Sequence, residues 1–389
     1  LVSAGARRPS PSSEGGDPSV TLLPMGAIAT DHAGRLRRLR SELAENALDS
    51  LLVTHLPNVR YLCGFTGSAA ALLVFHQDSI LFTDGRYRTQ AHEEVSAARI
   101  AIAKTSPLLA AAEYLAAPRK SLPTVGIEPE SITAGMRDRL QSMLKKKLRL
   151  RSAPPLIERA RMVKDAAEIL CIRRAVELGA TLFPIACKKI RPSATELEVA
   201  AAMEYAARCA GAEGMSFPTI LASGPRSAII HGRASTARIP RRGFVVCDFG
   251  VILAGYCSDR TRTVHVGLPS NEARELYECV LEAQLAAIAA VRPGVTCAEV
   301  DGAARRVLRK HKLARYFTHS TGHGLGLEIH EAPRLAAGQG QRLEPGMVVT
   351  IEPGAYVPGK WGVRIEDVVV VTSSGCEPLT PTDKELAVM

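Results

Sequence analysis

The chain has 389 residues, of which 46% are hydrophobic, a mean hydropathy of +0.05 and a formal net charge of +10. This length is enough for two or more domains with buried cores, and without an apolar run of about 18 residues no membrane span is predicted. The basic residues are dispersed, and their one dense run, residues 145–151, has neither interleaved aromatics nor a recognition motif, which argues against nucleic-acid binding.

The cysteines indicate a reducing compartment. There are nine, an odd number, and they are scattered without a C-x-x-C pair. This pattern favours reduced thiols in the cytoplasm over a disulfide framework. Cys247 and Cys257 lie beside candidate metal ligands but are expected to be small buried hydrophobic residues.

Residues 1–30 are rich in Ser, Pro, Gly and Ala and show no apolar periodicity. They therefore predict a disordered tail. Because the chain opens with Leu1, an over-extended gene start, with Met25 as the true first residue, is one interpretation of this segment.

Residues 31–156 predict an α/β domain of about 125 residues. A basic amphipathic helix is expected over residues 32–47, and the alternation of Leu148 and Leu150 with arginines predicts a half-buried strand. Pro154 and Pro155 mark a stiff break at the end of this domain. The other expected strands are residues 51–54, 70–75, 80–83, 100–103 and 125–127.

Residues 157–389 have a different texture and predict an α+β domain in which helices are segregated from a curved antiparallel sheet. Four helices carry N-terminal signals, and three of them have the spacing of a capping box. The expected cap pairs are Asp165 with Glu168, Ser193 with Glu196, Thr296 with Glu299 and, less regularly, Ser270 with Glu272. The expected strands are residues 244–253, 256–266, 347–352 and 362–371.

Four acids and one histidine in this second domain predict a metal site. Asp248 and Asp259 are separated by an Ala254-Gly255 turn signal, so a hairpin would bring the two carboxylates together. Glu352 ends one expected strand, Glu366 lies in the next, and glycines flank His323, which leaves room for an ion at close approach. Burying four ionised carboxylates without cations is prohibitive, whereas two divalent cations balance their charge.

Such a pair of cations activates water and stabilises a tetrahedral intermediate in metal-dependent hydrolysis. One imidazole with oxygen ligands favours Mn²⁺, with Co²⁺, Fe²⁺ and Zn²⁺ as alternatives. Neighbouring groups are assigned no metal role: Asp367 is expected to be a surface acid, and His265 a core histidine whose hydrogen bonds are satisfied.

The motifs resemble those of the creatinase, aminopeptidase P and prolidase group of metallopeptidases. The resemblance covers residues 31–389 and implies a creatinase-type N-terminal α/β domain followed by a catalytic domain of pita-bread fold. It rests on DFG…YCSDRTRT, GHGLGLEIHE, IEPG and RIED in the second domain. In the first domain, YLCGFTGS from Tyr61 and TDGRYRTQA from Thr83 are similar to Xaa-Pro aminopeptidases of this group.

The resemblance also implies a role for individual residues. Asp259 and Glu366 would bridge the two ions, Glu352 would in addition shuttle the proton of the attacking water, and Arg364 lies beside the last ligand. The implied metal ligands are Asp248, Asp259, His323, Glu352 and Glu366. The implied substrate-binding or oxyanion-stabilising residues are His231, His319, His330 and Arg364. Ile230 replaces the proline that many relatives have before the first of these histidines.

The expected function is therefore hydrolysis of the N-terminal Xaa-Pro bond of a proline-containing peptide by a metal-activated hydroxide, in a homodimer. The principal alternative is a prolidase, which cleaves only Xaa-Pro dipeptides and shares the metal ligands. Creatinase would not need all five ligands, and methionine aminopeptidase would not need the first domain. A pita-bread binding protein without activity would typically have lost ligands, and this chain retains every candidate.

Overall fold

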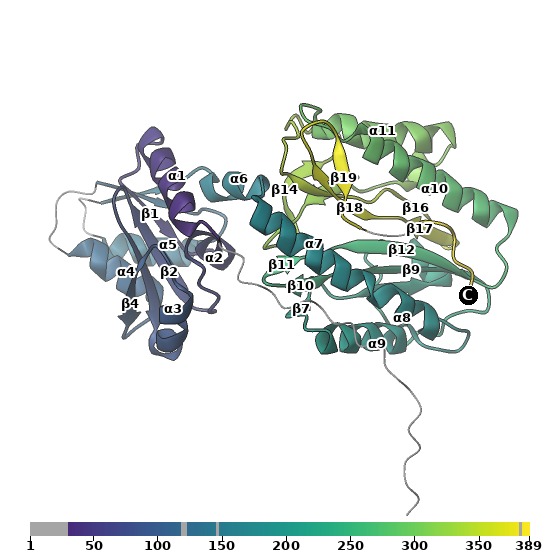
Figure 1. Cartoon of the computed structure of the whole chain (residues 1–389), viewed down its shortest axis with the longest axis horizontal. Helices are drawn as coiled ribbons and strands as arrows, with labels where there is room; N and C mark the ends of the chain where they lie inside the picture. The colour runs from purple at the N-terminus through teal and green to yellow at the C-terminus, as the bar shows by residue number, and fades with distance from the viewer. Residues whose placement is uncertain (1–29, 118–122, 145–147, 381–382) are drawn as a thin grey trace, which may run out of the picture.

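The computed structural model describes residues 30–117, 123–144, 148–380 and 383–389. The predicted tail, apart from residue 30, and the lysines of the basic run, residues 145–147, lie outside this part of the chain. The described elements form an N-terminal lobe, from α1 to β6, and a C-terminal lobe, from α7 to β19, with α6 between them (Figure 1). In the described residues, no helix combines the length and apolarity that a membrane crossing requires.

The N-terminal lobe is built on one six-stranded sheet in the order β4-β3-β2-β1-β5-β6. β2 runs antiparallel to β1 and β3, and the other neighbours pair in parallel. Its strands are β1 (Ser50–Val53), β2 (Ala70–Phe75), β3 (Ser79–Asp84), β4 (Arg99–Ala103), β5 (Thr124–Ile127) and β6 (Arg149–Ser152). Its helices are α1 (His32–Glu45), α2 (Leu56–Cys63), α3 (Arg88–Glu94), α4 (Pro107–Ala116) and α5 (Ala134–Met143), with the 3₁₀ turn η1 (Gly85–Tyr87).

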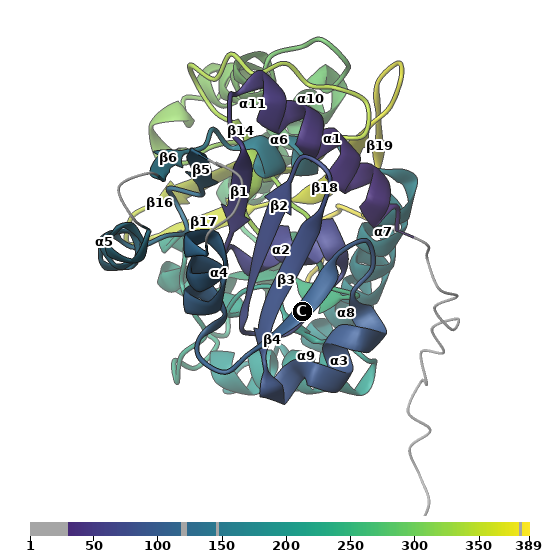
Figure 2. The same cartoon turned by 90° about the vertical axis from the view of Figure 1, so that its left-hand side faces the viewer.

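Both faces of this sheet are covered, which explains why its central strands are almost continuously apolar. Successive side chains alternate between faces, so Leu72 and Val74 of β2 pack into one core and Leu73 into the other. Figure 2 shows the sheet in front of the C-terminal lobe, with α1 and α4 on either side of its strands. The predicted helix and strands of this region are confirmed to within a few residues.

The C-terminal lobe contains α7 (Ala166–Ala180) and three further long helices around antiparallel sheets, as predicted. The remaining helices are α6 (Leu156–Met162), α8 (Leu182–Lys189), α9 (Glu196–Cys209), α10 (Asn271–Ala290) and α11 (Cys297–Lys310), with η2 (Gly224–Ala228) and η3 (Ala314–Tyr316). The strands of the two smaller three-stranded sheets are β7 (Gly214–Met215), β8 (Ile220–Ser223), β9 (Gly243–Phe249), β10 (Val251–Leu253), β11 (Tyr256–Cys257) and β12 (Arg260–Val266). The strands of the others are β13 (Gly322–Gly324), β14 (Glu331–Leu335), β15 (Val348–Ile351), β16 (Gly354–Val357), β17 (Trp361–Arg364), β18 (Asp367–Val371) and β19 (Cys376–Pro378).

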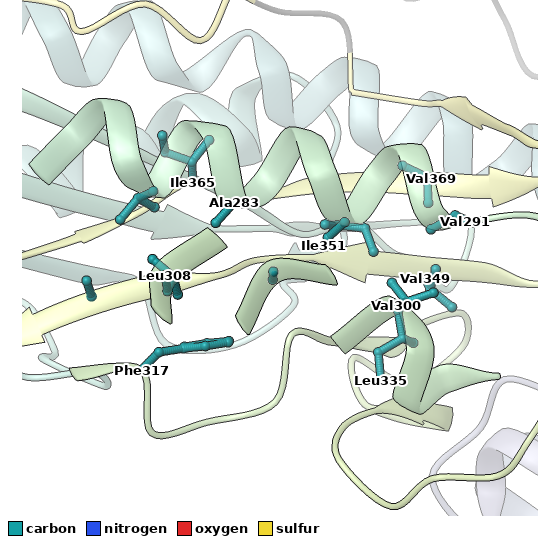
Figure 3. Packing of buried hydrophobic residues seen from close by; sticks show 14 of the residues in the cluster. Ala283, Val291, Val300, Leu308, Phe317, Leu335, Val349, Ile351, Ile365 and Val369 are labelled. Carbon is teal, nitrogen blue, oxygen red and sulfur yellow. The ribbon is translucent and has the colours of Figure 1, made fainter. Parts of the chain in front are cut away.

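The five-stranded sheet, β14-β13-β15-β18-β19, lies between two layers of helices. Val349 and Val369 face the core formed with α10 and α11, which Figure 3 shows at close range. Val348 and Val368, one position away on the same strands, face the core formed with α7. Since both sides of β15 and β18 are buried, this sheet is a rigid base for residues at its strand ends.

Three predictions for this lobe need correction. The cap of α9 is Thr195 with Glu198, not Ser193 with Glu196: Ser193 has a φ of +78°, and the Glu196 side chain is buried against other partners. Asp367 is not a surface acid but is fully buried in ion pairs with Arg262 and Lys384. The strands expected at residues 244–253, 256–266 and 362–371 are each divided in two.

One of these strand breaks has a clear steric cause. Gly250 separates β9 from β10, and a Cβ atom there would lie 1.8 Å from the carbonyl oxygen of Ser258. Only glycine, which has no Cβ atom, therefore fits at this position.

The predicted boundary between residues 156 and 157 falls at the start of α6, where Leu156 and Ile157 pack into the N-terminal core. The exact division of the chain into domains stays a prediction.

Candidate metal centre and active site

Five acidic and histidine side chains converge from the ends of different strands. Asp248 lies on β9, directly opposite Thr261 of β12, and Asp259 immediately precedes β12. His323 lies on β13, Glu352 directly follows β15, and Glu366 lies between β17 and β18. All five line one cavity of about 630 Å³. The predicted hairpin and the strand-end positions therefore bring the five side chains together.

His323 presents its Nε2 atom to the carboxylates. Its Nδ1 atom lies 3.0 Å from the carbonyl oxygen of Gly324 and acts as the donor there, because a carbonyl can only accept. Nε2 is 3.5 Å from Asp259 Oδ2 and 3.6 Å from Glu352 Oε1. Burial lowers the pKa of His323 to about 4, so the ring is neutral near pH 7 and a lone pair on Nε2 faces carboxylate oxygens. A cation between these atoms would turn this repulsion into attraction.

Three carboxylate oxygens in the cavity are buried and have no hydrogen-bond partner in the part of the chain that the structure describes: Asp248 Oδ1, Asp259 Oδ1 and Glu366 Oε1. Unpaired buried acceptors are costly and need an explanation. One Nε2 or carboxylate oxygen from each of Asp259, His323 and Glu366 lies within 4.8 Å of the others. The donor set, of carboxylates and one imidazole, fits a divalent cation.

The acids also perturb one another. Burial and then the neighbouring carboxylates raise the pKa of both Asp259 and Glu366 well above the ordinary range. Burial raises the pKa of Glu352 to about 8. Without added positive charge, the folded chain therefore favours protonated acids in this cavity. Cations would restore the ionised form, because they offer the charge that the cavity lacks.

Arg364 holds two of the acids in position. The buried guanidinium contacts Asp248 Oδ2 at 2.5 Å, Thr261 Oγ1 at 3.0 Å and Tyr356 Oη at 2.7 Å. Thr261 also donates to Glu366 Oε2 at 2.8 Å. Arg364 thereby orients one acid directly and a second through Thr261.

The other predicted histidines line the same cavity. His319 Nε2 lies 3.0 Å from Tyr356 Oη, and burial lowers the pKa of His319 to about 3. The rings of His323 and His330 meet edge to face with centroids 4.4 Å apart. His231 and His330 are exposed, so both are accessible to a bound substrate. All nine residues proposed from the sequence therefore line one cavity.

Sequence reasoning missed residues that line this cavity and residues that support it from behind. Tyr356 and Thr261 hold Arg364 and lie in motifs already noted, TIEPGAY and CSDRTRT, but phenol and hydroxyl groups carry no metal signal. Arg233 and Arg334 also line the cavity. Arg334 lies opposite His323 in the β13–β14 pair, so the two side chains leave the sheet on the same face.

Within the described residues, buried carboxylates with unpaired oxygens beside a neutral imidazole form, in an accessible cavity, the donor set that metal-dependent hydrolases use. Comparison with known proteins agrees with this class. Residues 170–373 match the model of metallopeptidase family M24, and residues 35–163 match the creatinase/prolidase N-terminal domain. The chain therefore belongs to metallopeptidase family M24.

Individual relatives match over almost the whole chain. It is 37% identical to an Xaa-Pro dipeptidase of Pyrococcus horikoshii over 353 residues, which are 90% of this chain and 98% of that protein. The structure of an Xaa-Pro dipeptidase from Bacillus anthracis superposes with a TM-score of 0.88 at 38% identity, covering 92% of this chain and all of that one. An X-Pro aminopeptidase from Thermotoga maritima gives 0.84 at 35%, covering 91% and 99%.

These matches confirm the family and fold class inferred from the sequence. The N-terminal lobe is a creatinase-type α/β domain, and the C-terminal lobe is the pita-bread catalytic domain of the family. Membership also implies divalent metal ions, in agreement with the donor set in the cavity.

Proposed function

We propose that this protein is a metal-dependent peptidase that hydrolyses the bond between an N-terminal residue and a following proline. The observation that carries the proposal is the group of buried carboxylates beside His323 in an accessible cavity, in which three oxygens have no hydrogen-bond partner among the described residues. The specificity for proline is supported by relatives of 37% and 38% identity that are Xaa-Pro dipeptidases.

Two divalent cations would be held by the five ligands proposed from the sequence. When bound, the cations supply Lewis-acid activation of water and of the scissile carbonyl. The five ligands are Asp248, Asp259, His323, Glu352 and Glu366.

The protein's own residues carry the proton transfers. Glu352 lies at the end of β15 with its carboxylate 3.6 Å from His323, so it is placed to take a proton from the attacking water. It would return this proton to the proline nitrogen, which has no N–H of its own and leaves only when protonated. His231 and His330 line the accessible side of the cavity and would donate to the developing oxyanion. Arg364 would hold the Asp248 carboxylate in position through its buried contact.

Between the two substrate classes, two observations favour the dipeptidase. The first is that two of the compared relatives are Xaa-Pro dipeptidases, whereas one is an X-Pro aminopeptidase. The second is the pair Arg233 and Arg334, which line the cavity and have no ion-pair partner within the described ranges. A guanidinium without a partner is suited to bind the free carboxylate of a dipeptide. The longer-substrate aminopeptidase remains the second candidate.

The finer assignments are part of the same proposal. Manganese is the proposed metal, because oxygen ligands dominate the donor set. Nine free cysteines support a reducing, cytoplasmic environment. A homodimer is proposed from the resemblance alone.

The test is an assay of the purified protein with an Xaa-Pro dipeptide and an Xaa-Pro-Xaa tripeptide, after chelation and again with added Mn²⁺. We expect turnover only with metal, and faster cleavage of the dipeptide. Asp259→Asn should abolish both metal binding and turnover. Asp367→Asn is the matched control, since this equally buried acid points away from the cavity; it should lower the Tm yet bind metal. Normal turnover by Asp259→Asn would refute the assignment.

A further inference from the structure

A second cluster of buried charges connects the N-terminal lobe to the loop that carries His330. Arg161, at the end of α6, is 3% exposed at its side chain and reaches two acids of this loop. Its Nη2 atom contacts Glu328 Oε2 at 2.8 Å and Glu331 Oε1 at 2.5 Å. Lys164 Nζ, equally buried, contacts the other Glu331 oxygen at 3.1 Å. Two positively charged and two negatively charged side chains therefore meet beside His330.

This cluster fixes the loop from within. The Glu331 carboxylate also accepts a hydrogen bond from the backbone N–H of Glu328 at 3.1 Å, which closes the turn that contains His330. A Cβ atom on Gly326 would lie 2.8 and 2.9 Å from the two carboxylate oxygens, so only glycine leaves room for them. The position of His330 is thereby coupled to the carboxylate of the next residue.

The cluster is also anchored in the N-terminal lobe. Asn58 of α2 is fully buried and accepts a hydrogen bond from Arg161 Nη1 at 2.7 Å. Its amide nitrogen donates to Glu128 and Glu158, each at 2.7 Å. His55 adds a second link, with its Nε2 atom 2.9 Å from Glu328 Oε2. His55, the N-cap residue of α2, therefore contacts a loop that lies 273 residues away in the sequence.

The energetics favour a positional role over simple stabilisation. Burying arginine, lysine and two acids costs desolvation energy that their attraction only partly offsets, and apolar residues often serve stability better. What such a network supplies is one defined arrangement, because every charge needs its partners. The residue held in place here contacts His323, with ring centroids 4.4 Å apart.

We propose that Arg161 is a positioning residue that holds His330 against the metal centre by gripping Glu328 and Glu331, with Asn58 of the N-terminal lobe setting the orientation of its guanidinium. The N-terminal lobe then takes part in catalysis within the same chain. The proposal rests on the proposed function for its kinetic test and has a second readout that does not.

The kinetic test is a double-mutant cycle of Arg161→Gln and His330→Ala on the metal-loaded protein with an Xaa-Pro dipeptide. Arg161→Gln should lower kcat at least about tenfold while KM changes less than about twofold. The double variant should be no slower than His330→Ala alone, within about threefold, because Arg161 acts only through that histidine. Fold-losses that multiply, or a normal kcat for Arg161→Gln, would overturn the proposal.

Arg35→Gln is the matched control. Arg35 is likewise buried where the two lobes meet and pairs with two acids, Asp165 and Glu168, whereas none of its hydrogen bonds or ion pairs within the described residues reaches the His330 loop. Its removal should lower the Tm without a selective loss of kcat. If Arg35→Gln and Arg161→Gln lower kcat equally, the cluster is structural only.

Arg161→Lys keeps the charge and serves where Arg161→Gln fails to fold. A lysine has one nitrogen for the two acids but lacks the guanidinium fork, in which Nη2 contacts Glu328 and Glu331 while Nη1 contacts Asn58. The kcat should therefore fall between those of the wild type and Arg161→Gln, or below wild type where only Arg161→Lys folds. A wild-type kcat for Arg161→Lys would contradict the need for the fork, and the same cycle with His330→Ala applies to it.

The second readout is the histidine NMR spectrum of ¹³C-labelled, metal-free protein. The His330 ring signal, identified by its loss in His330→Ala, should be single and sharp in the wild type and broadened or split in Arg161→Gln. An unchanged signal would overturn the proposal. If the wild type cleaves no Xaa-Pro peptide, the proposed function fails, and this spectrum alone decides the positioning role.

Discussion

Metal binding should release protons, and the pKa shifts of the buried acids predict how many. The perturbation is the addition of a divalent cation to metal-free protein near pH 7. Burial raises the pKa of Glu352 to about 8, so roughly 90% of this carboxyl is protonated at pH 7. Burial and neighbouring acids also raise the pKa of Asp259 and Glu366. Because carboxyl groups bind metal as carboxylates, about one proton should leave from Glu352 and up to about two from the others.

His323 should release none, because its pKa is lowered to about 4 and the ring is already neutral. The total is therefore between about one and three protons, and the metal affinity should rise about tenfold per pH unit for each proton released. The same shifts make the metal-free protein less stable as the pH rises from the ordinary carboxyl range, since the folded state then holds more protons than the unfolded state. Added metal should remove this loss.

Titration calorimetry at one pH in two buffers of different ionisation enthalpy measures the number of protons directly. Glu352→Gln should release about one proton fewer than the wild type, which ties the effect to this group. A release below about half a proton would refute the reasoning, because the cavity would then hold its acids ionised without any cation.

Three further predictions concern stability. Ile351→Ala should lower the free energy of unfolding, measured by urea denaturation, by about 2–5 kcal/mol, because this fully buried side chain packs in the core with α10 and α11. A smaller loss would mean that neighbouring side chains move to fill the cavity. Thr195→Ala should lower the free energy of unfolding by about 1 kcal/mol, because the α9 cap is lost, whereas Ser193→Ala should lower it by less than about 0.5 kcal/mol. A larger loss for Ser193→Ala would support the cap expected from the sequence. The hydrogen bond to Glu328 raises the pKa of His55, so the stabilisation by this pair is complete below the ordinary value of 6.5 and is lost as the pH rises through the raised one. His55→Gln should therefore lower the Tm more near pH 5.5 than near pH 8.5. The difference between the two losses in the free energy of unfolding should be about 0.5–1 kcal/mol, and equal losses at both pH values would contradict the pairing.

Helix starts and strands were predictable where the signal is local. Asp165 with Glu168 and Thr296 with Glu299 form the expected capping boxes, because a cap depends only on side chains three positions apart. The same rule misplaced the start of α9 by two residues, since Ser193 and Thr195 both precede a glutamate at the right spacing. Only the packing of Glu196 against Ser223 and Ser235 decides between them.

Strand continuity was less predictable. The expected strand at residues 362–371 divides at Ile365 and Glu366, where the chain leaves one sheet and enters another. A period of two places alternate residues on opposite faces but does not reveal such a transfer. It therefore could not show that Asp367 would be buried in a pair with Arg262, which lies in a distant strand.

The sequence by itself determined the chemistry of the site: acids and a glycine-flanked histidine at strand ends, a donor set that suits divalent cations. Residue type and local spacing are enough for that, because charge and pleat are properties of short segments. Tertiary structure alone decided that Arg161 reaches the loop of His330 and Asn58 reaches Arg161, that Tyr356 holds Arg364, and that Arg233 and Arg334 line the same cavity. These contacts join residues far apart in the chain, and no local pattern records which distant side chains the folded core brings within hydrogen-bond distance.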